Sequence, residues 1–191
     1  MSRPPLKDCN LFFFDSETGG LSPVHNDLVE VACIVTDPSG KDILGEYSVK
    51  VFPERPVDPK AAAVNGYTEV KWAAEAVKLD EAMVHLLKLA RNTALVAHNA
   101  PFDWGFLEMA MARRAQRWPG DYHRFCTVAL ATPLLKAGLV ENLKLGTLTK
   151  YFGIKHDDAH TALADVRACR ELYLKLMEIY APLFNSRKDT E

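Results

Sequence analysis

The chain has 191 residues, a length that predicts one domain, because domains usually hold about 100–200 residues. Hydrophobic residues make up 48% and charged residues 25%, which excludes a disordered chain and supplies enough apolar side chains for a core. The formal net charge of −2 excludes a protein that holds long duplex DNA by positive charge alone. It leaves room for a small nucleic-acid site, since acidic catalytic residues lower the total.

No stretch of the sequence predicts a signal peptide or a membrane-spanning helix. The first ten residues are polar, and no apolar run approaches the roughly 18 residues that a membrane helix needs. The cysteines at positions 9, 33, 126 and 169 are scattered and form no CxxC pair, which favours buried, reduced thiols over a disulfide or a zinc site. We therefore expect a cytoplasmic protein without membrane contacts.

The first third of the chain predicts three strands in an antiparallel meander. Residues 11–14 are a short apolar run, residues 28–37 are β-branched and end at a Pro-Ser-Gly turn, and residues 43–52 end before Pro53. Short connections of this kind favour antiparallel pairing. A proline-punctuated connection follows over residues 53–59.

The rest of the chain alternates between helical and strand patterns. Apolar spacing predicts helices over residues 79–89, 103–117 and about 159–180, with Pro101 placed where a helix can begin. Residues 93–97 and 122–125 predict two further short strands. Strands that are first antiparallel and then alternate with helices indicate an α/β fold, a mixed sheet with helices against it.

Carboxylates stand at three places where predicted elements end or begin. Asp15 and Glu17 follow the first strand, and residues two apart in an extended chain project to the same face. Asp103 follows the strand at 93–97, and Asp165 lies one or two turns into the last helix, five residues after His160. Each acid alone is explained as a turn or capping residue, but strand ends and a helix start can also converge on one cleft.

Converging carboxylates predict a metal site, because they cannot all stay ionised without a cation. Their oxygen ligands suit Mg²⁺ or Mn²⁺ rather than zinc. Four acids can hold two ions about 3.5–4 Å apart, the arrangement that supports in-line displacement at a phosphodiester. A histidine takes up a proton near neutral pH, which makes His160 the candidate base.

Three segments resemble the motifs of the DnaQ-like (DEDDh) 3′→5′ exonucleases, a family that includes the proofreading ε subunit of bacterial DNA polymerase III and ribonuclease T. Residues 14–21 (FDSETGGL) resemble D-x-E-T followed by Gly-Leu, residues 98–103 (HNAPFD) resemble H-N-A-x-F-D, and residues 160–165 (HTALAD) resemble H-x-A-x-x-D. The three motifs stand in the family's order and span most of the chain, which makes them specific where a lone D-x-E is weak.

The resemblance implies a ribonuclease H-like fold, a five-stranded mixed sheet flanked by helices, in a single exonuclease domain over residues 1–191 with its catalytic core at about 9–181. It implies an enzyme that removes nucleoside monophosphates from single-stranded 3′ ends of DNA or RNA with two Mg²⁺ or Mn²⁺ ions. A DNA polymerase or a second copy of the chain are the candidate partners.

The resemblance also implies roles for individual residues. Asp15 would bridge both metals, while Glu17 and Asp165 would bind the first. Asp103 would serve the second metal through water, and His160 would be the general base. Contacts to the terminal nucleotide are implied for Ser16, Thr18, Leu21, Asn65, Asn99 and Phe102.

The sequence departs from the family pattern at three places outside these metal ligands. Gly19 stands where many members have threonine, and Asn65-Gly66-Tyr67 stands where proofreading subunits often have His-Gly-Ile. Cys126-Thr127 replaces the Asp-Thr of some members. The change at position 65 makes one implied role less certain, namely the hydrogen bond of Asn65 near the 3′ end.

Two other classes of function are open. His156 and His160 have the i, i+4 spacing of a helical zinc pair, but the glutamate of the metalloprotease pattern is absent. We therefore interpret His156 as exposed and incidental, and Asp157 and Asp158 as helix-start acids. A non-catalytic nucleic-acid-binding module on the same fold is the second class, and the intact set of acids argues against it.

Within the enzyme hypothesis the substrate is open. Ribonuclease T-like trimming of RNA ends, free DNA exonuclease activity and proofreading all fit the motifs. Four arginines near a helix end either track phosphates or solvate the surface, and the second interpretation is favoured because charge runs are usually solvated. They are Arg113, Arg114, Arg117 and Arg124.

Overall fold

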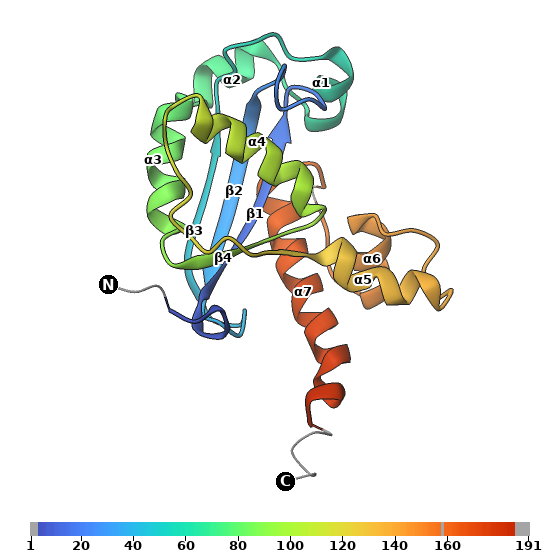
Figure 1. Ribbon diagram of the computed structural model, residues 1–191. Coiled ribbons are helices and arrows are strands. Elements are labelled where there is room, and N and C mark those ends of the chain that lie inside the picture. Colours follow the sequence, from blue (N-terminus) through green and yellow to red (C-terminus); the bar gives the residue numbers. More distant parts are fainter. Residues whose placement is uncertain (1–3, 158, 186–191) are drawn as a thin grey trace.

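The computed structural model describes residues 4–157 and 159–185. Its centre is a five-stranded mixed sheet in the order β3-β2-β1-β4-β5, with helices on both faces (Figure 1). The strands are β1 (Asn10–Thr18), β2 (Leu28–Thr36), β3 (Ile43–Lys50), β4 (Thr93–Ala97) and β5 (Arg124–Cys126). A 3₁₀ turn, η1 (Leu6–Asp8), precedes the helices α1 (Pro59–Asn65), α2 (Glu69–Glu75), α3 (Leu79–Leu89), α4 (Ala100–Ala112), α5 (Thr127–Lys136), α6 (Leu145–Phe152) and α7 (Ala162–Asn185).

The antiparallel meander expected from the sequence is confirmed, since β2 pairs antiparallel with both β1 and β3. β4 pairs parallel with β1, and β5 pairs parallel with β4, which makes the sheet mixed. The placement of the first two acids was wrong in detail. Pairing with β2 extends β1 as far as Thr18, so Asp15 and Glu17 lie within the strand rather than after it.

The long helices were predicted with errors at their ends. The segment 79–89 matches α3, but α4 begins at Ala100 and ends at Ala112, and Ala115 beyond it has a positive φ of 50° that no helix accepts. α7 begins at Ala162 because His160 adopts a left-handed conformation with φ 71°. The sequence did not predict α1, α2, α5 and α6, which are short helices of 7 to 10 residues.

The alternation of β1 divides the core between the two faces of the sheet. Phe12 and Phe14 belong to the cluster beneath α3 and α4, whereas Leu11 and Phe13 belong to the cluster beneath α7. A third cluster packs α5 and α6 against α7. All four cysteines are free, as expected, although Cys126 is only partly buried.

This architecture brings the three motif segments together. β1 carries the first motif, α4 follows directly on β4 with the second, and α7 packs against β1 and β2 with the third in its first turn (Figure 1). Helix starts that follow strand ends gather polar side chains at one edge of a sheet. Over residues 4–157 and 159–185, no helix has the length and apolar character needed to cross a bilayer.

Candidate active site

Asp15 and Glu17 continue the side of β1 that faces α7. Side chains of alternate residues in a strand share a face, so both follow the row of Leu11 and Phe13 that packs under this helix. The first turn of α7 contributes Asp165, the fourth residue of the helix. The expected convergence of these acids is therefore seen in the structure.

Glu17, His160 and Asp165 form a compact group. A carboxylate oxygen from each acid and a ring nitrogen of His160 all lie within 4.8 Å of one another. The left-handed conformation of His160 turns the chain just before α7, and its side chain is exposed. Thr161 then caps the helix, since its Oγ1 accepts from the backbone N–H of Ala164 at 3.3 Å.

Asp103 reaches the site from α4 on the other face of the sheet. Its side chain is buried, and its Oδ1 accepts from the backbone N–H of Ser16 at 3.1 Å and from Ser16 Oγ at 2.8 Å. Ser16 stands between Asp15 and Glu17 and points to the face opposite theirs. The two hydrogen bonds therefore tie the second motif to the first.

The acids hold their protons unusually strongly. Burial raises the pKa of Asp15 well above its usual range, and repulsion from Asp103, Asp165 and Glu17 adds to this effect. Burial also raises the pKa of Glu17 to about 8, helped by repulsion from Asp165. The pKa of Asp103 rises to about 7 through burial, although the hydrogen bonds from Ser16 oppose the rise.

This donor set fits a divalent cation. Carboxylates that raise one another's pKa are repelled at neutral pH, and a bound cation removes that penalty. The ligands on offer are mostly carboxylate oxygens, which suit Mg²⁺ or Mn²⁺. Asp15, Glu17, Asp103 and Asp165 are the residues that could hold such ions.

The interpretation of His156 as exposed and incidental was wrong. Its Nε2 lies 2.6 Å from Asp165 Oδ1, and only 11% of its side chain is exposed. Neither His156 nor His160 lies in a helix, so their i, i+4 spacing does not place them as a helical zinc pair. Asp157 does not start α7, because it lies five residues before the helix. It is exposed and pairs with Lys155 at 2.8 Å. Asp158 lies outside the described residues.

Glu30 is a further acid at the site that sequence reasoning missed. It lies on β2 directly opposite Glu17, is buried, and accepts a hydrogen bond from the backbone N–H of Ala162, the first residue of α7. Burial raises its pKa, and the nearby Lys50 opposes the rise. Glu30 thus ties β2 to the helix that carries Asp165. An acid inside an otherwise apolar strand was the available signal.

A pocket of about 330 Å³ opens beside Glu17. Five of the six predicted substrate residues line it, and α1 adds Lys60 and Val64, which were missed because α1 itself was not predicted. Leu21 stands at its rim with 86% of its surface exposed. We call this cavity the end pocket; its predicted residues are Ser16, Thr18, Leu21, Asn65 and Phe102.

The sixth predicted residue, Asn99, lines a second pocket of about 840 Å³ on the other side of the acids, with His98, His156, His160 and Asp165 among its walls. The structure also gives Asn65 a structural task. Its Nδ2 donates to the carbonyl of Thr18 at 3.1 Å, which joins α1 to the end of β1. The roles of these residues toward a substrate stay predictions.

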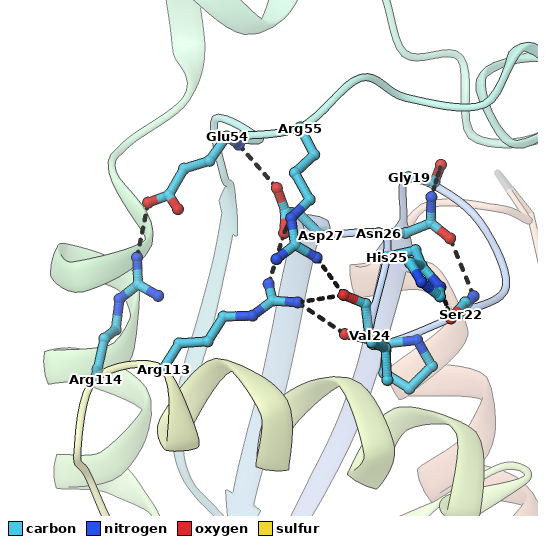
Figure 2. A network of polar contacts seen from close by, with 11 residues as sticks. Gly19, Ser22, Val24, His25, Asn26, Asp27, Glu54, Arg55, Arg113 and Arg114 are labelled. Atoms are coloured by element: carbon cyan, nitrogen blue, oxygen red, sulfur yellow. Dashed lines mark hydrogen bonds and ion pairs between the residues drawn. The ribbon is translucent and has the colours of Figure 1, made fainter.

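Three of the four arginines contact other side chains of the protein. Arg113 pairs with Asp27 at 2.8 Å, and Arg114 pairs with Glu54 at 2.9 Å (Figure 2). Arg114 also pairs with Asp80. The guanidinium of Arg124 lies 3.4 Å from the centre of the Trp104 ring. Arg117 and Arg124 are both exposed, as the favoured interpretation expected.

Comparison with known sequences gives a family match and relatives. Residues 12–173 match the sequence profile described as RNase_T, exonuclease. A DNA polymerase III subunit epsilon-like protein of Rhodobacter capsulatus is 35% identical over 93% of this chain, and the DNA polymerase III subunit epsilon of Treponema pallidum is 27% identical over 88%. The chain covers 76% of the Treponema protein but only 25% of the Rhodobacter protein.

The fold is likewise shared with a solved structure. Exonuclease I of Escherichia coli, in a complex with single-stranded DNA, superposes with a TM-score of 0.80 at 24% identity over 93% of this chain and 42% of that one. The expected ribonuclease H-like fold is therefore confirmed.

Proposed function

The chain belongs to the exonuclease family, and from that premise we propose that it removes nucleoside monophosphates one at a time from the 3′ end of single-stranded DNA. The observation that carries the proposal is the group of repelling carboxylates with the end pocket directly beside it, since Glu17 belongs to both. A single catalytic unit with its core over residues about 9–181 is part of this proposal.

The four acids have separate positions around the reacting phosphate. Asp15, Glu17 and Asp165 would hold one divalent ion, and Asp15 and Asp103 the other. Two bound Mg²⁺ or Mn²⁺ ions supply the positive charge that makes water nucleophilic at neutral pH and stabilises the leaving oxygen. Ser16 keeps Asp103 in place through its two hydrogen bonds.

His160 would accept the proton of the attacking water. It is exposed, and its ring lies in the same compact group as Glu17 and Asp165, so solvent and the reacting phosphate can both reach it. A general base of this kind contributes about 10²–10⁴-fold to a rate.

The end pocket would hold the terminal nucleotide. Its volume lies in the range of about 300–1,000 Å³ that is typical of small-molecule sites, too small for a duplex. Leu21, Val64 and Phe102 give it apolar walls, and apolar contacts with a base do not distinguish one base from another. The pocket therefore supports removal of any terminal nucleotide.

Two relatives favour DNA over RNA and a polymerase as partner, because they carry the names DNA polymerase III subunit epsilon-like protein and DNA polymerase III subunit epsilon. The family description RNase_T supports RNA end trimming as the second candidate. Oligonucleotides labelled at the 3′ end, of identical DNA and RNA sequence, separate the two. Faster release of labelled mononucleotide from DNA supports the proposal, and faster release from RNA favours the second candidate. Release only of longer fragments would contradict exonuclease action on both.

A further inference from the structure

One wall of the end pocket is formed by the loop between β1 and β2, residues 19–27, which we call the wall loop. Leu21, at the rim of the pocket, belongs to it. The loop is closed by its own backbone: the N–H of Gly19 donates to Asp27 O at 2.8 Å, and the N–H of Asn26 donates to Ser22 O at 2.8 Å. These bonds fix its internal shape, but they do not fix its position relative to α4.

Arg113, which follows the last residue of α4, makes that connection (Figure 2). Its Nη1 donates to Asp27 Oδ1 at 2.8 Å, and its Nη2 donates to the carbonyl oxygens of Pro23 and Val24, both at 3.0 Å. A guanidinium group presents its donors in a rigid planar fork, so contacts at three acceptors hold the loop in one orientation. Arg55 adds a further bond to Val24 O from the connection after β3.

Asp27 is the buried half of this anchor, with 5% of its surface exposed. Its second oxygen, Oδ2, accepts from the backbone N–H of Glu54 at 2.9 Å. A buried carboxylate is tolerated only where hydrogen bonds and an opposite charge compensate for the lost water. The pair of Asp27 and Arg113 is therefore a fixed part of the fold, unlike an exposed surface ion pair.

The same helix carries the opposite wall of the end pocket. Phe102 lines the pocket from the first turn of α4, next to Asp103, while Arg113 holds the wall loop from the other end of the helix. Gly105 lies between them and faces the wall loop, since a Cβ at this position would make an ordinary van der Waals contact with Pro23 Cγ at 3.5 Å. One rigid element thus sets the distance between Leu21 and Phe102.

We propose that Arg113 and Asp27 are positioning residues that hold Leu21 against the end of a single strand, an inference that rests on the proposed function. Neither residue lines the end pocket, so both act through the wall loop. Leu21 is exposed at the rim, where it would contact the nucleotide that precedes the terminal one. Loss of the contacts between Arg113 and Asp27 would therefore weaken binding of a single strand more than it lowers the rate of hydrolysis at the acids.

The test compares Arg113→Gln with the matched control Arg114→Gln. Arg114 is the next residue, but its partners are the exposed carboxylates of Glu54 and Asp80 and it does not touch the wall loop. Each variant and the wild type are assayed on a single-stranded oligonucleotide and on the p-nitrophenyl ester of thymidine 5′-monophosphate. The ester carries one nucleoside and has no preceding nucleotide for Leu21 to contact.

The proposal expects Arg113→Gln to raise KM for the oligonucleotide about tenfold with kcat changed less than about threefold, and to change both constants for the ester less than about threefold. Arg114→Gln should stay within about twofold of wild type on both substrates. An equal loss on oligonucleotide and ester would overturn the proposal, since a general structural defect affects both alike. Arg113→Lys keeps the positive charge but not the planar fork of donors. Its KM for the oligonucleotide should lie between those of the wild type and Arg113→Gln.

Amide hydrogen exchange tests the anchor without any assay of activity. The backbone N–H groups of Gly19 and Asn26 should exchange faster in Arg113→Gln than in the wild type, at temperatures where the variants are folded. In Arg114→Gln their exchange rates should equal those of the wild type. Unchanged exchange in the wall loop of Arg113→Gln would overturn the inference. A wild type that does not shorten oligonucleotides would contradict the proposed function instead, so the two failures are distinct.

Discussion

The imidazole Nε2 of His156 lies 2.6 Å from Oδ1 of Asp165, although nine residues separate them in the chain. The contact holds the side chain of Asp165 in one orientation, while a carboxylate oxygen of this residue also belongs to the group with Glu17 and His160. Residues that hydrogen-bond to a metal ligand, without binding the metal themselves, commonly affect metal affinity strongly. His156 is therefore a supporting residue of the candidate metal site.

Replacing His156 by Phe should weaken metal binding. The ring keeps its approximate size but loses the nitrogen that contacts Asp165, so the carboxylate is no longer held. We expect the Mg²⁺ or Mn²⁺ concentration for half-maximal activity to rise about 10–100-fold. The midpoint of thermal stabilisation by the metal should shift in parallel. Lys155→Ala, which removes an exposed ion pair with Asp157, is the control. Equal midpoints in all three proteins would show that His156 has no such role.

Replacing Asp103 by Asn should abolish most turnover and leave the fold intact. An amide oxygen can still accept the bonds from Ser16, but the negative charge that serves a metal is lost. Because the buried carboxylates repel one another, the metal-free variant should melt at a higher temperature than the wild type. Wild-type turnover in Asp103→Asn would show that Asp103 has no role in catalysis. A melting temperature of the metal-free variant below that of the wild type would contradict the repulsion between the buried carboxylates.

Without metal, the protein should lose stability as the pH rises from about 4 to about 8. The pKa of Glu17 is raised to about 8, so over this range the folded state keeps a proton that the unfolded state has released, and a higher pH favours unfolding. Asp103, with a pKa of about 7, acts in the same direction. One pKa unit corresponds to about 1.4 kcal/mol, so we expect the free energy of unfolding to fall by several kcal/mol.

Denaturant titrations in EDTA at several pH values measure this effect directly. Added Mg²⁺ should restore the lost stability at the upper end of the range, because the cation replaces the bound protons. The variant Glu17→Gln should show a flatter dependence, since its side chain does not titrate. Rising stability between pH 5 and about 8 in EDTA would contradict the raised pKa values.

Replacing His160 by Ala should lower kcat about 10²–10⁴-fold while KM stays close to that of the wild type. The side chain is exposed and starts no packed element, so the fold should not change. Added imidazole should restore part of the rate in this variant, because a small base can enter the open site. His85→Ala, which removes an exposed histidine of α3 that lines neither pocket, is the control. A loss of rate in His160→Ala without rescue by imidazole would argue for a structural role.

The sequence was a good guide to the strands because their signals are local. Residues 93–97 are apolar or β-branched without interruption, residues 28–36 are so apart from Glu30, and the two segments become the buried strands β4 and β2. The boundaries of β1 and α7 depend on tertiary contacts instead. β1 continues through its acids only because β2 pairs with them, and the start of α7 is set by the backbone conformation of His160.

The acids of the site were also predictable, whereas their supporting residues were not. Asp15 and Glu17 stand in a recognisable motif, so residue type and order were enough to find them. Glu30 and Arg113 act through contacts between segments far apart in the chain, at 2.8 Å for Arg113, and His156 acts through a contact at 2.6 Å across the loop before α7. Such contacts exist only once the fold places the segments together, and a single sequence does not encode them as a pattern.

The most direct test of the central claim is a time course on a single-stranded DNA oligonucleotide labelled at its 5′ end, with wild type and Asp15→Asn side by side. In Mg²⁺ or Mn²⁺ the wild type should give a ladder that shortens from the 3′ end, EDTA should stop it, and Asp15→Asn should leave the substrate intact in every metal. A ladder of equal rate in Asp15→Asn, or in EDTA, would contradict a metal-dependent exonuclease at these acids.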